Sequence, residues 1–193
     1  AERVRAAYAA TSALDAAAQS SPAACPSSIS VVIVGGGLTG LTLASALTGA
    51  DAQLVILERS ACVGGVWRWY GNPHSRVNST EPCYRMRVRR EQPNTNHSYY
   101  FEIIDDMRLA IEQHGLASQI QLNATVACIR STGTGRGGGG INRWQACGKQ
   151  GGDHLSPSVS KSFAVVANQL LLLCTNRRLG APRAITYEGE ESY

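Results

Sequence analysis

The sequence predicts an α/β domain with a parallel sheet, because two β-branched runs flank a helical segment and a glycine-rich turn precedes that segment. Residues 30–34 and 53–57 are the two runs, and continuous apolar runs of this length are typical of strands buried in parallel sheets. Apolar side chains recur at helical spacing over residues 38–48. Strand, turn, helix and strand in this order make a βαβ unit.

The turn over residues 35–40 reads Gly-Gly-Gly-Leu-Thr-Gly and contains the pattern G-x-G-x-x-G. Between a strand and a helix, this pattern predicts a Rossmann-like dinucleotide site. Gly35 permits the tight turn, Gly37 lets the backbone approach a pyrophosphate, and Gly40 lets the helix pack closely on the strand. The alternative is a glycine-rich turn that binds no ligand.

The residues beside the turn supply the other parts of such a site. Leu38 and Thr39 open the predicted helix, and a helix N-terminus offers unpaired N–H groups and partial positive charge to a diphosphate. Glu58 ends the second predicted strand and is followed by Arg59. An acid at this position accepts hydrogen bonds from an adenosine ribose, which favours FAD or NAD over NADP.

The rest of the chain predicts one more helix and several strands. Residues 60–100 show no clear periodicity, and a long irregular segment inside a compact domain usually has a functional role such as wrapping a ligand. An amphipathic helix is expected over residues 101–114, and strands over residues 120–130, 141–147, 162–167 and 169–174. The predicted fold is a three-layer Rossmann-like domain with a parallel sheet and an added antiparallel β-meander at about residues 124–167.

Residues 1–29 are predicted to be an Ala/Ser-rich arm and linker ahead of a domain over residues 30–193. Strong helix formers over residues 3–19 predict a helix that docks as an arm. Because the segment is rich in Ala and Ser, poor in acids and lacks an initiator Met, we expect the remnant of an organelle-targeting region and a plastid location. The alternative is an ordinary helix in a cytoplasmic protein.

The composition argues against several classes of protein. A net charge of +4 spread along the chain does not indicate a nucleic-acid-binding module, and the absence of an apolar run of about 18 residues argues against a transmembrane helix. The six cysteines form no C-x-x-C pair, so no metal site is predicted, and reduced, mostly buried thiols are expected. Asp105 and Asp106 are expected on a solvated helix face, and Trp69 in packing.

A second group of motifs follows Glu58 and Arg59. These motifs are Gly-Gly-Val-Trp at 64–67, Arg-Val-Asn-Ser at 76–79 and Ile-Gln-Leu-Asn-Ala-Thr-Val at 120–126. In this order, the chain from residue 30 onwards resembles the N-terminal, FAD-binding segment of the flavin-containing and Baeyer–Villiger monooxygenases. The resemblance implies that FAD is the cofactor and that the flavin does most of the chemistry, so no catalytic residue is predicted.

The same resemblance implies roles for individual residues. Gly65, Val66 and Trp67 would place the flavin end of FAD. Asn78 would lie near the flavin ring, and the backbone of Val126 would meet the adenine. Together with the residues of the glycine turn, Glu58 and Arg59, these positions make up the predicted cofactor site.

The sequence departs from the family's pattern in two places. Cys174-Thr175-Asn176 stands where the family has Ala-Thr-Gly, so Asn176 adds a side chain where the family's backbone passes close to the cofactor. Tyr193 is the aromatic residue at which the family's next motif would begin. We therefore expect an FAD-binding domain that lacks the NADPH domain and the C-terminal return, is not catalytically complete alone, and uses NADPH only if a missing domain is supplied.

Two alternatives remain open. The chain could be a non-catalytic structural subunit that retains the fold, with FAD lost, inside a larger organellar complex such as a plastid membrane complex. A truncated domain would expose apolar surface where its missing parts would pack, so a protein partner covering that face is expected. A simple NAD-binding protein would explain Glu58 but not the motifs at 64–67 and 76–78.

Overall fold

The computed structural model describes residues 2–19, 24–79, 86–134, 142–151 and 160–175. Its helices are α1 (Glu2–Ala18), α2 (Leu38–Thr48), α3 (Gly65–Tyr70) and α4 (Tyr100–Gln113), with a 3-10 turn at Leu116–Gln119. Its strands are β1 (Ser28–Val34), β2 (Leu54–Leu57), β3 (Ile120–Gln121), β4 (Ala124–Thr134), β5 (Asn142–Gln150) and β6 (Lys161–Leu173).

The six strands form one mixed sheet in the order β3-β2-β1-β6-β5-β4. β1 pairs in parallel with β2, and β2 with β3. β6 belongs to both parts of the sheet, because residues 161–167 pair antiparallel with β5 while residues 166–173 pair in parallel with β1. The predicted parallel sheet with an added antiparallel meander is therefore confirmed.

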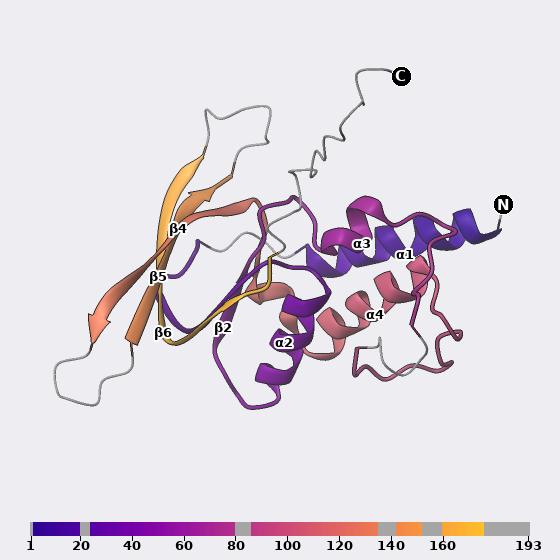
Figure 1. The fold of residues 1–193 in the computed structure, drawn as a ribbon, viewed down its shortest axis with the longest axis horizontal. Coiled ribbons are helices and arrows are strands. Elements are labelled where there is room, and N and C mark those ends of the chain that lie inside the picture. The colour runs from indigo at the N-terminus through magenta and orange to yellow at the C-terminus, as the bar shows by residue number, and fades with distance from the viewer. Residues whose placement is uncertain (1, 20–23, 80–85, 135–141, 152–159, 176–193) are drawn as a thin grey trace, which may run out of the picture.

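β1 separates two apolar cores, because successive side chains of a strand point to opposite faces. Val31 and Ile33 face the core that the helices cover, and Val32 and Val34 face a second core shared with the meander. Figure 1 shows the helices gathered on one side and β4, β5 and β6 on the other. This arrangement gives the three predicted layers.

The N-terminal helix α1 packs into the helical layer as predicted for residues 3–19. Ala7, Leu14 and Ala18 are buried in the core that also contains the apolar face of α4. The Thr11 hydroxyl lies 3.1 Å from the Tyr100 hydroxyl at the start of α4. α1 therefore forms part of the core of the described structure.

The single strand predicted over residues 120–130 is wrong. The structure splits it into β3 and β4, which lie at opposite edges of the sheet. Asn123 lies between them with a φ of 54°, a left-handed conformation that Asn tolerates better than most residues. The turn is held by the Asn123 and Ala124 amides, which donate to the Ser60 and Glu58 carbonyl oxygens at 3.0 and 2.8 Å.

The two strands predicted at 162–167 and 169–174 are also wrong, because the structure has the single strand β6. The polar pair Asn168 and Gln169 marks a bulge in this strand, where the register against β1 shifts between Ile29 and Val31. A bulge accommodates an extra residue without ending the strand. Its position is also where β6 changes from its antiparallel to its parallel neighbour.

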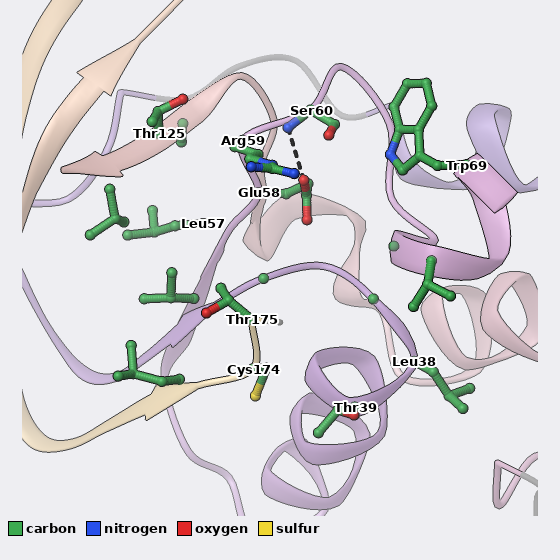
Figure 2. Close-up of a pocket in the computed structure, with 18 of the residues that line it drawn as sticks. Leu38, Thr39, Leu57, Glu58, Arg59, Ser60, Trp69, Thr125, Cys174 and Thr175 are labelled. Carbon is green, nitrogen blue, oxygen red and sulfur yellow. Dashed lines mark hydrogen bonds between the residues drawn. The ribbon is translucent and has the colours of Figure 1, made fainter. Parts of the chain in front are cut away.

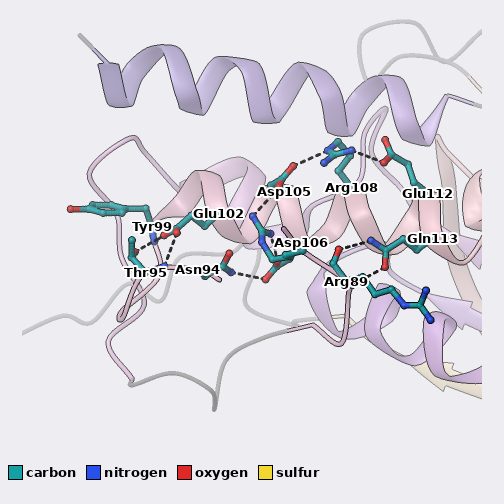
Figure 3. Close-up of polar contacts among 11 residues, drawn as sticks. Arg89, Asn94, Thr95, Tyr99, Glu102, Asp105, Asp106, Arg108, Glu112 and Gln113 are labelled. Carbon is teal, nitrogen blue, oxygen red and sulfur yellow. Dashed lines mark hydrogen bonds and ion pairs between the residues drawn. The ribbon is translucent and has the colours of Figure 1, made fainter. Parts of the chain in front are cut away.

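The segment before α4 is tied to that helix by side chains, which we call the α4 network (Figure 3). Arg90 bridges Asp105 and Asp106, and Asn94 donates to Asp106 at 2.9 Å. Asp106 is 1% exposed, so its predicted place on a solvated face is wrong. Glu102 accepts bonds from the Thr95 and Tyr99 amides, both at 2.7 Å, and so caps the helix.

The described residues contain neither a membrane-spanning helix nor a cluster of metal ligands. No helix there is long and apolar enough to cross a membrane, and no group of three or more potential metal ligands occurs among them. The cysteines of the described ranges are free and half-buried, whereas mostly buried thiols were predicted: Cys25, Cys62, Cys128, Cys147 and Cys174. Asn176 and Tyr193 lie outside the described residues.

Candidate cofactor-binding site

A groove of about 840 Å³ lies at the carboxyl ends of β1, β2 and β6 (Figure 2). This is the edge at which open α/β sheets bind ligands, and the volume lies in the range of cofactor sites. Most of the residues predicted for the cofactor line it: Gly35, Gly37, Leu38, Thr39, Glu58, Arg59, Gly65, Val66, Trp67 and Val126.

The glycine turn between β1 and α2 has no room for a side chain at Gly35 or at Gly40. Gly35 has a φ of 109°, and a Cβ there would lie 2.6 Å from the Cys174 carbonyl oxygen. A Cβ on Gly40 would collide with the Gly35 carbonyl oxygen. Gly40 does not line the groove; it allows α2 to pack against the turn, as its predicted role required.

The N-terminus of α2 opens toward the groove without a side-chain cap. Gly37 occupies the N-cap position, and the first turn contains no acidic residue. The first amides of a helix lack carbonyl partners within the helix and carry partial positive charge. Leu38 and Thr39 line the groove at this point, so the helix offers donors to an anion there.

Glu58 is fixed by two backbone amides of the site itself. One carboxylate oxygen accepts from the Gly36 amide at 2.7 Å and the other from the Ser60 amide at 2.8 Å. The residue is 7% exposed, and an ionised carboxylate has about four acceptor positions. Glu58 therefore holds the glycine turn and still has acceptor capacity for a ligand hydroxyl.

A second pair of glycines packs its backbone on the first turn. The Gly64 amide donates to the Gly36 carbonyl oxygen at 2.9 Å. Gly64 and Gly65 have φ values of 119° and 55°, and a Cβ on Gly65 would lie 3.0 Å from the Gly37 Cα. The close approach of these two turns brings the start of α3 to the flank of the groove.

α1 supports this second turn from behind. Arg68 of α3 donates to Asp15 of α1 at 2.8 Å. A Cβ on Gly64 would lie 2.8 Å from the Arg68 Cβ and 3.6 Å from a Leu14 methyl carbon.

Burial raises the pKa of the neighbouring Cys62 thiol although Arg68 acts to lower it, so we expect this thiol to remain protonated at neutral pH.

Several groove residues were not in the predicted cofactor site, among them Ser60, Trp69, Thr125, Cys174 and Thr175. For Cys174 and Thr175, the resemblance implied only that this segment passes close to the cofactor. Trp69 was assigned to packing, but it is 58% exposed and lines the groove. Cys174 and Thr175 directly follow β6, and this position at a strand's carboxyl end was the signal for them. Burial raises the pKa of the Cys174 thiol, which favours its neutral form.

Asn78 is not brought into the groove. It is exposed and follows Arg76, which forms an isolated antiparallel bridge with Tyr99. The Arg76 guanidinium stacks over the Tyr99 ring at 4.2 Å from its centroid. This segment lies beside the start of α4, so the predicted place of Asn78 beside a flavin stays a prediction.

The glycine turn, the uncapped helix and the buried acid define a Rossmann-like dinucleotide-binding domain. Residues 33–96 match the family model described as NAD(P)-binding Rossmann-like domain. Over 106 residues, or 53% of this chain, the sequence is 29% identical to an FAD-binding monooxygenase, VdtE, from Byssochlamys spectabilis, of which the match covers 19%.

Solved structures establish the fold. A polycyclic ketone monooxygenase from Thermothelomyces thermophila matches 81% of this chain with a TM-score of 0.60 and 19% identity, over 24% of its own length. OTEMO in complex with FAD and NADP matches 90% of this chain with a TM-score of 0.60 and 19% identity, over 29% of its own length.

The resemblance predicted from the sequence is thereby confirmed: the chain is similar to an N-terminal segment of the flavin monooxygenases. The matched segment spans about a fifth of the length of the curated relative. The chain is a Rossmann-like domain that is similar in sequence and fold to part of these enzymes.

Proposed function

We propose that this chain binds FAD in the groove, as the FAD-binding domain of a flavin-dependent monooxygenase-like oxidoreductase. The observation that carries the proposal is that the glycine turn, the uncapped start of α2 and Glu58 all face one groove. These are the donors and the acceptor that an adenine dinucleotide needs for its pyrophosphate and ribose.

The groove suggests a direction for the bound molecule (Figure 2). Thr125 of β4 lies on the side of Glu58 and Arg59, where the adenosine would bind, and Val126 follows it in the lining of the groove. The pyrophosphate would lie on the first amides of α2. Gly65, Trp67 and Trp69 of α3 would then contact the flavin half.

The described residues of the groove bind and orient rather than transfer protons. Its ionisable groups are Glu58, which two amides hold, the exposed Arg59 and the Cys174 thiol, whose pKa burial raises. Bound FAD would supply the redox chemistry. Val66, Trp69 and Leu173 at the groove are 47, 58 and 63% exposed, and we propose that further protein covers them and supplies the NADPH site.

Titration of the purified 193-residue chain with FAD tests the proposal. We expect saturable binding of one FAD per chain, followed by flavin fluorescence and visible circular dichroism, with ADP as a competitor. Glu58→Gln should weaken FAD binding at least tenfold, about 1.4 kcal/mol. The Gln side chain has one acceptor oxygen in place of two, so it cannot accept hydrogen bonds from both backbone amides and from a ribose hydroxyl. Glu112→Gln, on the exposed side of α4, is the matched control and should leave the affinity unchanged.

A parallel titration with NAD⁺ separates FAD binding from the alternative of a simple NAD-binding protein. Tighter binding of NAD⁺ than of FAD would overturn the proposal. Failure of both dinucleotides and of ADP to bind a folded chain would favour the structural-subunit alternative, which stays a prediction together with the plastid location.

A further inference from the structure

The meander contains two cysteines that face each other across neighbouring strands. β4 and β5 pair antiparallel, with Val126 opposite Gly148 and Cys128 opposite Cys147. The register shifts between Val126 and Cys128, so Ala127 is the extra residue of a bulge. Without this bulge, Cys147 would lie opposite Ala127, and the two thiols would not be cross-strand partners.

We infer that Cys128 and Cys147 are an oxidisable thiol pair, which peroxide converts to a disulfide between β4 and β5. Directly opposite residues of an antiparallel pair point to the same face, with Cβ atoms about 4.5–5.5 Å apart. A disulfide requires Cα atoms about 4.4–6.8 Å apart and Cβ atoms about 3.5–4.5 Å apart. Opposite residues of an antiparallel pair have Cα atoms about 4.5 or 5.5 Å apart, which meets the first requirement. A small movement of the two Cβ atoms toward each other meets the second.

The surroundings of the two thiols agree with this assignment. Both residues are half-buried, which leaves them accessible to a small oxidant. The two side chains are hydrogen-bonded to each other, which brings the two sulfur atoms together. Burial and this contact raise the pKa of the Cys147 thiol while Arg130 acts in the opposite direction, so the attack of this thiol on peroxide is slowed and the neighbouring position of the two thiols is what supports the assignment. The other free cysteines of the described residues lie on other segments, so this pair is distinguished by its register in the sheet.

Hydrogen peroxide accounts for the atoms and electrons of the reaction. One thiolate attacks a peroxide oxygen, the O–O bond breaks, and the released hydroxide takes up a proton to form water, leaving a sulfenic acid. The second thiolate attacks that sulfur, the S–O bond breaks, and a second water leaves. Two thiols are oxidised by two electrons to one disulfide, and one peroxide is reduced to two waters.

Peptide mapping of the full chain tests the inference. The reduced protein is treated with hydrogen peroxide at low protein concentration, its remaining thiols are alkylated, and the monomer is digested with trypsin without reduction. Cleavage after Arg or Lys places Cys128 in peptide 109–130 and Cys147 in peptide 144–149. We expect these two peptides to be linked, with a mass two hydrogens below their sum, and to separate on reduction.

Two variants make the result decisive. Cys147→Ser should abolish the linked peptide, whereas Cys62→Ser, a half-buried cysteine elsewhere, should leave its yield unchanged. Recovery of both peptides unlinked after peroxide has consumed the thiols, or their linkage to other cysteines, would overturn the inference. Circular dichroism of each variant before oxidation verifies that the fold is retained.

Discussion

The groove and the α4 network each hold a buried acid, but they are built from different parts of the chain. Glu58 accepts hydrogen bonds from backbone amides of the turns that form the groove. Asp106 contacts the side chains of Arg90 and Asn94, which tie an extended segment to a helix. The groove should therefore be sensitive to added side chains, and the network to removed ones.

The two regions also differ in what they contribute, since the groove serves binding and the network serves stability. At the groove, the start of α2 has no side-chain cap and keeps donors for a ligand. In the network, Arg90 pairs with Asp105 and Asp106. Arg108 pairs with Asp105 and Glu112, so these charged side chains have their partners within the protein (Figure 3). Changes at the groove should alter cofactor affinity, and changes in the network should alter the free energy of unfolding.

The largest effect is expected for Gly40→Ala. Its Cβ would collide with the Gly35 carbonyl oxygen, and because backbone cannot move aside as a side chain can, we expect a loss of about 3 kcal/mol of unfolding free energy. Gly49→Ala is the control, because a Cβ there would meet the Ala46 carbonyl oxygen at an ordinary 3.4 Å. Urea unfolding measures both, and equal stability of the two variants would contradict the packing role of Gly40.

Arg90→Ala should have the next largest effect. It leaves Asp106, 1% exposed, without its cationic partner, and we expect a loss of about 2–3 kcal/mol of unfolding free energy. Arg89→Ala is the control, because the hydrogen bonds between Arg89 and the Gln113 side chain use the backbone N–H and C=O of residue 89 and remain in the variant. If urea unfolding gave the same small change for both variants, the α4 network would not contribute to stability as the structure indicates.

Gly37→Ala tests the groove without disturbing the fold. A Cβ there would lie 3.5 Å from the Gly65 Cα, an ordinary contact, yet it would occupy the surface on which a pyrophosphate is proposed to lie. We expect the unfolding free energy to stay within about 0.5 kcal/mol and FAD to bind about 10-fold to 100-fold more weakly, which is about 1.4–2.7 kcal/mol. Unchanged FAD affinity in a folded variant would place the ligand elsewhere.

The sequence predicted the groove well because its determinants are local. The glycine pattern, the helix that follows and the acid after β2 are close in sequence, and their geometry follows from backbone sterics and helix polarity. Trp69 and Thr125 were missed as groove residues because they reach the groove only through the position of α3 and the turn at Asn123.

The errors in the predicted fold have the same origin. A break at Asn123 and continuity through Asn168 and Gln169 look alike in the hydrophobic pattern, since each is a polar interruption of an apolar run. Neighbouring strands decide between them: β6 has β1 and β5 on its two sides, so a bulge is less costly than a turn. The burial of Asp106 likewise depends on Arg90, which lies in a segment without periodicity.

Asp106→Asn should have the smallest effect on the unfolding free energy. Its pH dependence should be opposite to that of most carboxylates in ion pairs. Burial, more than the lowering influence of Arg90, makes the pKa of Asp106 higher in the native state than its ordinary value. The native state then binds this proton more tightly than the unfolded chain, so the stabilisation is complete below the unfolded value of about 3.9 and is lost as pH rises through the native pKa. Wild type should therefore gain stability relative to the Asn variant as pH falls through that range, and near pH 7 the variant should lose less than Arg90→Ala. Urea unfolding of both proteins between pH 7 and pH 3 measures the difference, and a variant that gains on wild type at acid pH would show that the ion pair with Arg90 outweighs burial.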